Sequence, residues 1–372
     1  MTGTLDLTEF HDELRTVARN VLAAADRDSA PSWTRVSTSG WLGLEVDEEF
    51  DGAGAGFAET AVVLREYGRA AARGPLPAVA ALAVPALGLV DPGSVRDRLL
   101  REAVAGATVP VLVLGGETLG VTPFRLDSGV EGPVLHGETS FVLDAPGADR
   151  LLVPATRSDG TVVLVDVDPG AGGVEVTDQP VLDATRSFGR VVAEGAVVAA
   201  DTVHAFRDGA SAPRHLADRA AVAVACDSLG LAEAMLDTTV AYVGVREQFG
   251  RRIGSFQAVK HACADMLVSI SVSRRLVAAA VRNVAEGAPD AAVSVSMAKS
   301  HVCAAAVDIA GKAMQLHGGM GYTWESGIHV YLKRATLNRS LFGSPAEHRR
   351  RLAQRYVSPA GVRPRACGPR RS

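Results

Sequence analysis

The chain has 372 residues, of which 47% are apolar and 5% aromatic, and its formal net charge is -4. This length suffices for two or three domains with sizeable cores, and the scarcity of aromatic residues favours closely packed helices. So weak a net charge gives no support to nucleic-acid binding or membrane-surface binding as the function class.

The N-terminal residues, MTGTLDLTEFHDELR, carry acidic side chains where a signal peptide has basic ones, and no apolar segment follows. The most apolar run, residues 76–90, is too short to span a bilayer and contains Pro77 and Pro85, so we interpret it as buried helix. The four cysteines lie far apart without a CxxC pair, which favours buried thiols in a reducing compartment. We therefore expect a cytoplasmic protein without a membrane span or a metal site.

Residues 1–105 follow a helical period and are expected to form an N-terminal all-α domain. Phe10, Leu14, Val17 and Val21 are spaced i, i+4, i+7 and i+11, which places them on one face of a first helix. The glycine-rich loop GWLGLEVDEEFDGAGAGFAE follows without a preceding strand or a GK[ST] sequence. Phosphate-loop binding is therefore not supported.

Residues 106–211 switch to a period of two and predict a middle domain that is β-barrel-like and mostly antiparallel. The segments TVPVLVLGG, PVLHGETSFVLDA, RLLVPA, GTVVLVDVD and GRVVAEGAVV alternate or are rich in β-branched residues. Gly, Pro and Asp turns separate them.

Residues 212–357 return to long helical patterns and predict a C-terminal four-helix bundle. The expected helices lie near 215–247, 255–285, 289–316, 325–340 and 345–357. Residues 358–372 are rich in Pro, Gly and Arg with almost nothing apolar to bury, which predicts a disordered basic tail. The fold class is accordingly α+β, in the order helical domain, β domain, helical domain.

The last helix has a clear start signal in SLFGSPAEHRRR. Ser344 is the expected N-cap, Pro345 the first helical residue, and Glu347 completes a capping box. The loop before it, 341–343, carries no acidic residue.

Two segments of the last region, VREQFGRRIGSFQAVKHACADM and QLHGGMGYTWESGIHVYLKRA, resemble signatures of the acyl-CoA dehydrogenase family of flavoproteins. LGLEVDEEFDGAGAG near the start and the α–β–α order extend the resemblance over essentially the whole chain. The resemblance implies FAD as the cofactor and an acyl thioester as the substrate, oxidised to a trans-2-enoyl product. It also implies an oligomer, a dimer or tetramer, with an electron-transfer flavoprotein or another acceptor taking the electrons.

The resemblance assigns cofactor-binding residues to both signatures. In the family, these positions hold the adenine and pyrophosphate of a neighbouring subunit's FAD, and here they are Arg246, Phe249, Gln257, Gln315 and Gly319. An arginine offers a planar fork of donors to a pyrophosphate, and a glycine lets backbone approach closely.

Other positions that contact the flavin in relatives are only partly kept. Ser344 matches a small hydroxyl residue that touches the flavin, in addition to its expected role as a helix cap. Phe141 stands where a Trp meets the ring and can still stack. Leu143 replaces a hydroxyl residue and cannot donate a hydrogen bond. The T-x-P-x-x-G-S-D segment of active relatives is absent.

The family's catalytic Glu is missing from both of its usual positions, which hold Phe342 and Ala220 here. Asp227 lies seven residues beyond Ala220 and therefore on the same helix face. Burial in this apolar stretch should raise its pKa above about 3.9, which suits a general base. The alternative is a buried Asp bonded to a neighbouring helix.

Three functions are compatible with these residues. The leading hypothesis is an FAD-dependent dehydrogenase of acyl-CoA or acyl-carrier thioesters, with Asp227 as the base. The second is a non-catalytic or half-site partner in a hetero-oligomer with a related subunit. This pattern resembles the short subunits of the α2β2 branch that degrades sterol side chains, because motifs serving a neighbour's flavin persist while the chain's own contacts are eroded. The third is a flavin monooxygenase or a nitroalkane-oxidase-like enzyme, which an Asp base would fit.

Overall fold

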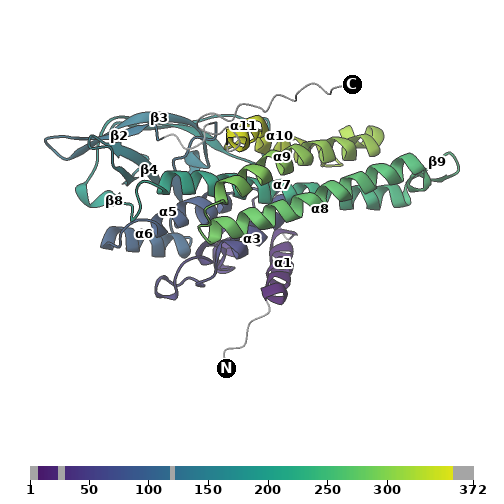
Figure 1. Cartoon of the computed structure of the whole chain (residues 1–372), viewed down its shortest axis with the longest axis horizontal. Helices are drawn as coiled ribbons and strands as arrows, with labels where there is room; N and C mark the ends of the chain where they lie inside the picture. Colours follow the sequence, from purple (N-terminus) through teal and green to yellow (C-terminus); the bar gives the residue numbers. More distant parts are fainter. Residues whose placement is uncertain (1–6, 24–29, 118–121, 355–372) are drawn as a thin grey trace, which may run out of the picture.

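The computed structural model describes residues 7–23, 30–117 and 122–354. Figure 1 shows the N-terminal helices and the sheet together at one end, and long C-terminal helices that extend to the other end. This order agrees with the α+β class predicted from the sequence. The predicted tail, 358–372, lies outside the described residues.

The N-terminal part is built from short helices around a buried core. The α-helices are α1 (Leu7–Ala23), α2 (Trp33–Thr38), α3 (Phe57–Arg69), α4 (Leu76–Ala78), α5 (Val84–Gly88) and α6 (Ser94–Val104). Shorter turns are η1 (Trp41–Gly43), η2 (Glu48–Phe50) and the π-helical η3 (Val79–Ala83). The apolar run at 76–90 is buried helix as predicted, with Leu82 3% and Leu87 0% exposed.

Helix α1 buries only part of the face that its periodicity indicates, since Leu14 and Val21 pack against the core in partly buried positions. Ala18 is fully buried, whereas Phe10 and Val17 remain 42% and 48% exposed. On the same helix, Arg19 donates to the buried carboxylate of Glu66 on α3, with an Nε–Oε2 distance of 2.8 Å. The predicted apolar face is thus wrong at Phe10 and Val17, while the helix is also held to α3 through this ion pair.

The sheet lies between the two helical parts in the chain order, and in space it sits at one end of the molecule. Its strands are β1 (Pro110–Leu112), β2 (Phe124–Ser128), β3 (Pro133–Leu143), β4 (Arg150–Arg157), β5 (Val162–Val167), β6 (Val174–Asp178), β7 (Phe188–Val197) and β8 (Val203–Ala205). Short turns η4 (Ala145–Gly147) and η5 (Ala200–Thr202) connect some of them.

The strand order is β6-β7-β3-β2-β4-β5-β8, with β1 also paired to β4. Pairings are antiparallel except that β1 and β2 both run parallel to β4, so the sheet is mixed. Among the described residues the outermost strands β6 and β8 do not pair, and the sheet is open rather than barrel-like. Strands β2, β6 and β8 were missed in the sequence because each is short and lies outside the long apolar or β-branched segments.

The C-terminal helices form an elongated bundle around α9. They are α7 (Ala212–Val245), α8 (Gln257–Ala285), α9 (Ala291–Leu316), α10 (Ile328–Ser340) and α11 (Pro345–Gln354). A hairpin of β9 (Glu247–Gln248) and β10 (Arg251–Arg252) with η6 (Ile253–Ser255) joins α7 to α8, and η7 (Gly318–Tyr322) precedes α10.

Helix α9 is long and apolar enough to cross a membrane, but 61% of its apolar window is buried inside the protein. It packs against α7, α8, α10 and α11. This environment is that of a core helix.

Glycines bring α3 and α7 into backbone contact. A Cβ added to Gly230 of α7 would lie 1.9 Å from the Arg65 carbonyl oxygen, and one added to Gly68 of α3 would lie 2.1 Å from the Asp227 carbonyl oxygen. Only glycine permits so close a crossing. The crossing places Asp227 at the junction of the N-terminal helices and the bundle.

Candidate functional site

The start of α11 has the capping box that the sequence predicts. The Ser344 backbone N–H donates to Glu347 Oε2 at 2.6 Å, and the Glu347 backbone N–H donates to Ser344 Oγ at 3.3 Å. These bonds lower the pKa of the Glu347 carboxyl. The cap therefore fixes the end of the preceding loop, and Glu347 is occupied by it.

The loop before α11 is bonded to the β domain through its backbone. The Phe342 N–H donates to the Gly116 carbonyl oxygen at 2.7 Å, and the Gly116 N–H donates to the Phe141 carbonyl oxygen at 3.1 Å. Phe342 and Phe141 have φ values of 50° and 54°, a left-handed conformation that is costly for bulky residues. Two sequence-predicted positions, Phe141 and Phe342, are thus brought together.

Two buried side chains that sequence analysis missed hold the same loop. Lys299 Nζ donates to the carbonyl oxygens of Asn338 at 3.0 Å and Gly343 at 2.9 Å. His348 Nε2 lies 3.0 Å from the Phe342 carbonyl oxygen, and burial lowers the pKa of this imidazole to about 4, which favours the neutral ring. The sequence signal for Lys299 is its position among apolar and small residues in the first half of α9.

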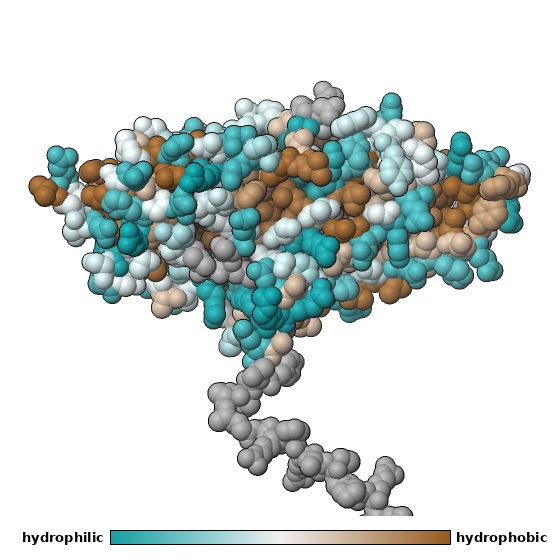
Figure 2. Space-filling view, turned by 90° about the horizontal axis from the view of Figure 1, so that it is seen from above, coloured by the Kyte–Doolittle hydropathy of each residue, from teal (hydrophilic) through white to brown (hydrophobic). Residues whose placement is uncertain are grey.

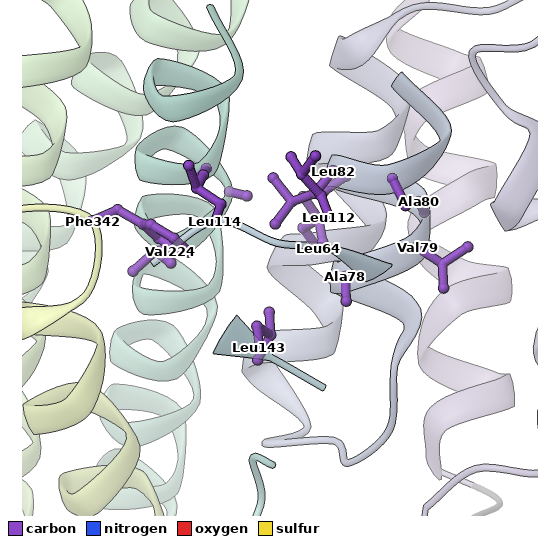
Figure 3. Close-up of a cluster of buried hydrophobic side chains, with 14 of the residues drawn as sticks. Leu64, Ala78, Val79, Ala80, Leu82, Leu112, Leu114, Leu143, Val224 and Phe342 are labelled. Atoms are coloured by element: carbon purple, nitrogen blue, oxygen red, sulfur yellow. The ribbon is translucent and has the colours of Figure 1, made fainter. Parts of the chain in front are cut away.

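The Phe342 ring lies in an apolar cluster. Figure 3 shows it beside Val224 of α7 and Leu114, which follows β1. Leu143 at the end of β3 and Ala220 on α7 are also buried. Both usual positions of the family's Glu are therefore filled by buried apolar side chains.

A cavity of about 10 Å³ lies nearby, lined by residues that include Leu112, Leu114 and Leu216. That volume is about enough for one water molecule. An acyl chain cannot enter this cavity unless the surrounding side chains move.

Asp227 is the acceptor at the centre of a buried polar network. It is 4% exposed and accepts hydrogen bonds from Arg334 Nε at 3.0 Å, Arg186 Nη2 at 3.0 Å and Asn338 Nδ2 at 2.6 Å. Arg334 Nη2 donates to the same carboxylate. Both carboxylate oxygens are therefore already bonded.

The expected rise in the pKa of Asp227 is wrong. Burial by itself raises the pKa of this carboxyl, but the charges of Arg334 and Arg186 and the hydrogen bonds from Arg334 and Asn338 outweigh it. The pKa is lowered below its ordinary value. The carboxylate stays charged and bonded to neighbouring elements, as in the alternative weighed above.

Sequence analysis missed the partners of Asp227. Arg334 and Asn338 lie four residues apart on α10 and so share a face, a spacing that offered a signal. Arg186 lies in the loop between β6 and β7, and no sequence pattern indicated that it would contact Asp227.

The predicted adenine and pyrophosphate residues lie at the opposite end of the bundle. Arg246 and Phe249 are in the α7–α8 hairpin, and Gly319 follows α9. The ends of α7 and α9 meet where Tyr242 stacks on His317 with ring centroids 4.3 Å apart. This end lies far from the sheet in Figure 1.

The remaining predicted residues divide between the two ends. Gln257 begins α8 and Gln315 lies in the last turn of α9, so both belong to the far end, which we call the distal end. Phe141 lies in strand β3 instead, and Ser344 directly precedes α11, which lies near the sheet. One chain therefore does not bring all predicted flavin contacts together.

The distal end fits an extended anionic cofactor. Arg246 and Gln315 are exposed, and Phe249 is 89% exposed. Gly319 has no positive φ, and an added Cβ would meet nothing within 4 Å, so the fold itself does not require glycine there. Its small size is explained if a ligand approaches this backbone from outside the chain.

Comparison with known proteins identifies the family. The profile of the acyl-CoA dehydrogenase C-terminal domain matches residues 207–357, and that of the N-terminal domain matches residues 4–106. Acyl-CoA dehydrogenase IpdE2 of Mycobacterium tuberculosis is 32% identical over 315 residues, covering 84% of this chain and 82% of the relative. The chain belongs to the acyl-CoA dehydrogenase family, whose members are FAD-binding oxidoreductases acting on CH–CH groups.

Solved structures agree with this assignment. The ChsE4–ChsE5 complex from Mycobacterium tuberculosis has a TM-score of 0.84 at 26% identity, covering 94% of this chain and 98% of that chain. The Tcur3481–Tcur3483 steroid acyl-CoA dehydrogenase has a TM-score of 0.80 at 27% identity, again covering 94% and 98%. The similarity to the sterol branch noted from the sequence is confirmed.

Proposed function

We propose that the chain takes part in FAD-dependent α,β-dehydrogenation of an acyl thioester as the half-site subunit of a hetero-oligomer. It would hold the adenine and pyrophosphate of a related subunit's FAD and leave proton abstraction to that subunit. One observation carries the proposal. Phe342 is 2% exposed inside an apolar cluster where the family places its base, while the distal flavin motif remains exposed.

The residues of the distal end suit this role. The Arg246 guanidinium can pair with a pyrophosphate in a bidentate manner, and Phe249 offers a ring for stacking. Gly319 leaves room for backbone N–H groups to approach the phosphates. When bound, FAD supplies the acceptor for the hydride that leaves the β-carbon.

The chain's own flavin-ring site is poorly suited to catalysis. Phe141 can stack on a flavin ring, but Leu143 offers no donor and Phe342 no base. ChsE4–ChsE5, a similar structure, is a complex of two named chains, which supports a hetero-oligomer. The steroid enzyme among the similar structures makes a steroid-derived acyl thioester the first substrate class to test.

A self-sufficient dehydrogenase that uses Asp227 is less well supported. A general base needs a free lone pair and a pKa near the working pH, and Asp227 has bonded oxygens and a lowered pKa. The same objection applies to a monooxygenase with this base.

The test is the visible spectrum of the purified chain under anaerobic conditions, before and after acyl-CoAs are added. A steroid-derived acyl-CoA and straight-chain acyl-CoAs should be compared. We expect a folded, colourless chain, and a yellow complex that bleaches with substrate once a related subunit bearing the Glu is co-expressed. Flavin that is held and bleached by the chain alone would overturn the half-site proposal and make Asp227 the first residue to mutate.

A further inference from the structure

Three parts of the chain meet at a buried cluster of charged side chains. Arg334 of α10 and Asp227 of α7 come from the bundle, and Arg186 comes from the loop between β6 and β7. Tyr67 of α3 lies against both arginines, whose guanidinium carbons are 5.6 Å (Arg186) and 5.8 Å (Arg334) from its ring centroid. We call this cluster the central junction, and its members are Tyr67, Asp144, Asp183, Arg186, Asp227 and Arg334.

Three polar atoms of the central junction lack a partner. Asp144 Oδ2, Asp183 Oδ2 and Arg186 Nη1 are buried and bond to nothing in the part of the chain that the structure describes. Asp144 and Asp183 are 7% and 2% exposed, and the Arg186 side chain is 6% exposed. Figure 2 shows hydrophilic residues spread over the surface, where solvent can bond them, whereas these three atoms are enclosed. Buried polar atoms are nearly always bonded, either to protein or to ordered water.

Asp144 and Arg186 lie at the ends of two paired strands. Leu143 of β3 pairs with Phe188 of β7, and the Asp144 N–H donates to the Ser187 carbonyl oxygen at 2.9 Å. Burial raises the pKa of the Asp144 carboxyl to about 7, and Arg186 exerts the largest of the charge effects that oppose the rise. The unpaired donor of Arg186 and the unpaired acceptor of Asp144 are nevertheless not bonded to each other. A molecule that accepts from one and donates to the other would satisfy both.

Asp183 reaches the junction beside Arg334. Its Oδ1 accepts from the Thr185 N–H at 3.0 Å and hydroxyl at 2.7 Å, and the same hydroxyl oxygen accepts from Arg334 Nη1 at 3.3 Å. Every nitrogen of Arg334 is engaged, since Nε and Nη2 donate to Asp227 and Nη1 also donates to the Ala72 carbonyl oxygen. The nearby guanidinium is therefore committed to other acceptors, and Asp183 Oδ2 takes no bond from it.

The unpaired atoms need an occupant that both accepts and donates. Arg186 Nη1 needs an acceptor, whereas the oxygens of Asp144 and Asp183 need donors. The guanidinium charge repels a metal cation, and the two carboxyl groups disfavour an anion. A buried water molecule typically makes about three hydrogen bonds to groups that would otherwise be unsatisfied. Water is therefore the occupant with the matching chemistry.

We propose that the central junction is a binding site for internal water, which accepts from Arg186 Nη1 and donates to Asp144 Oδ2, with water also donating to Asp183 Oδ2. The inference does not rest on the proposed function, because all of these residues belong to one chain and none of them is assigned to the flavin.

Water at this place ties the β domain to the bundle. The loop between β6 and β7 is bonded to β3 at its first residue, where Gln179 Oε1 accepts from the Phe141 N–H at 2.6 Å. The water joins the last part of the same loop, at Arg186, to Asp144 at the end of β3. Arg186 Nη2 in turn donates to Asp227 of α7 at 3.0 Å. The strand that carries Phe141 is thereby held at both ends of the loop.

A crystal structure of the chain at a resolution that shows ordered water tests the site directly. We expect electron density for water within hydrogen-bond distance of Arg186 Nη1 and Asp144 Oδ2, and of Asp183 Oδ2. A direct ion pair between Arg186 and Asp144, a bound ion in place of water, or no density beside the three atoms would overturn the proposal.

Oxygen-17 relaxation dispersion tests the site in solution, because it counts internal water molecules that exchange slowly with solvent. Asp183→Leu removes an acceptor and places apolar atoms at the site, so this count should fall by at least one. Asp159→Leu is the matched control. Asp159 Oδ1 likewise accepts from the Thr161 N–H at 2.8 Å and hydroxyl at 2.7 Å, but Asp159 is exposed. An unchanged count in Asp183→Leu, or an equal loss in both variants, would overturn the proposal.

Asp183→Asn replaces Asp183→Leu if the latter does not fold. The asparagine carbonyl still accepts from Thr185, and its Nδ2 takes the place of Oδ2. Because water accepts as readily as it donates, the crystal structure of this variant should keep the water, now bonded to Nδ2. An Nδ2 that bonds to a protein group, with no water beside it, would overturn the site at Asp183.

Discussion

Asp227 shows what a single residue reveals in sequence and what it does not. Its position on the Ala220 face and its burial could be predicted from the helical period and the apolar neighbours. The direction of its pKa could not, because Arg186 and Arg334 come from distant parts of the chain and only the fold brings them together. A buried carboxyl without partners and one with two arginines look identical in sequence.

Asp227→Asn tests the structural role of this carboxylate. Removing the charge leaves Arg334, which is fully buried, without its counter-ion, and breaking a buried pair typically costs about 3–5 kcal/mol. We expect the free energy of unfolding in urea to fall by about 3 kcal/mol. Asp237→Asn is the control, because Asp237 is 61% exposed in its pair with Arg69 and should cost under about 1 kcal/mol. Unchanged stability together with lost flavin reduction in the complex would make Asp227 the base after all.

A second buried acid predicts how stability depends on pH. Burial raises the pKa of Asp144 to about 7, the charges of Arg186 and Arg334 oppose the rise only in part, and Oδ2 has no hydrogen-bond partner among the described residues. The unfolded carboxyl has a pKa of about 3.9. Between about pH 4 and 7 the folded chain therefore holds a proton that the unfolded chain has lost. Stability should fall as pH rises through this window.

Asp144→Asn removes that titration. The variant should match the wild type near pH 4 and exceed it at pH 8 by about 2–4 kcal/mol, because it stays neutral at every pH. Urea unfolding from pH 4 to 8 measures how the free energy of unfolding of each protein changes with pH. If the free energy of unfolding changes with pH in the same way in both proteins, Asp144 is charged in the folded chain over this whole pH range.

At the scale of helices and strands, the sequence predicted correctly those features whose residues lie close together in the chain. The capping box of Ser344 and Glu347 could be predicted because both partners lie within four residues. The exposure of Phe10 and Val17 on α1 could not, because it depends on how α1 packs against α3, which is distant in the sequence. The open, mixed sheet was also beyond the sequence, because two parallel pairings join strands far apart in the chain.

The α3–α7 crossing yields a prediction with a matched control in one helix. Gly230→Ala places a Cβ 1.9 Å from the Arg65 carbonyl oxygen, so the helices must separate, and we expect a loss of about 1–3 kcal/mol. Gly244→Ala, also in α7, meets nothing within 4 Å and should stabilise by up to about 1 kcal/mol through helix propensity. Thermal unfolding of the two variants and the wild type measures these changes in stability. Equal effects of the two substitutions would mean that the crossing relaxes freely.

At the scale of the whole molecule, the division of the predicted flavin contacts between two ends could not be predicted from the sequence alone. The motifs indicate the residues, but their separation, with Phe141 in β3 and Arg246 at the far end of the bundle, follows from the length and direction of α7. A 34-residue helix spans about 50 Å at 1.5 Å per residue. Under the proposed function, the distal residues therefore serve a neighbour's FAD.

Arg246→Ala tests this division in the assembled protein. Loss of a charge-assisted contact to the pyrophosphate should cost about 1.5–3 kcal/mol, which corresponds to roughly 10- to 150-fold weaker FAD retention. FAD released on dilution of the co-expressed complex measures it, and Arg275→Ala, exposed on α8, is the control. If the flavin belongs to the partner's site, the substitution on this chain should empty it while the two subunits remain associated. Undiminished FAD retention would mean that the distal end does not bind the cofactor.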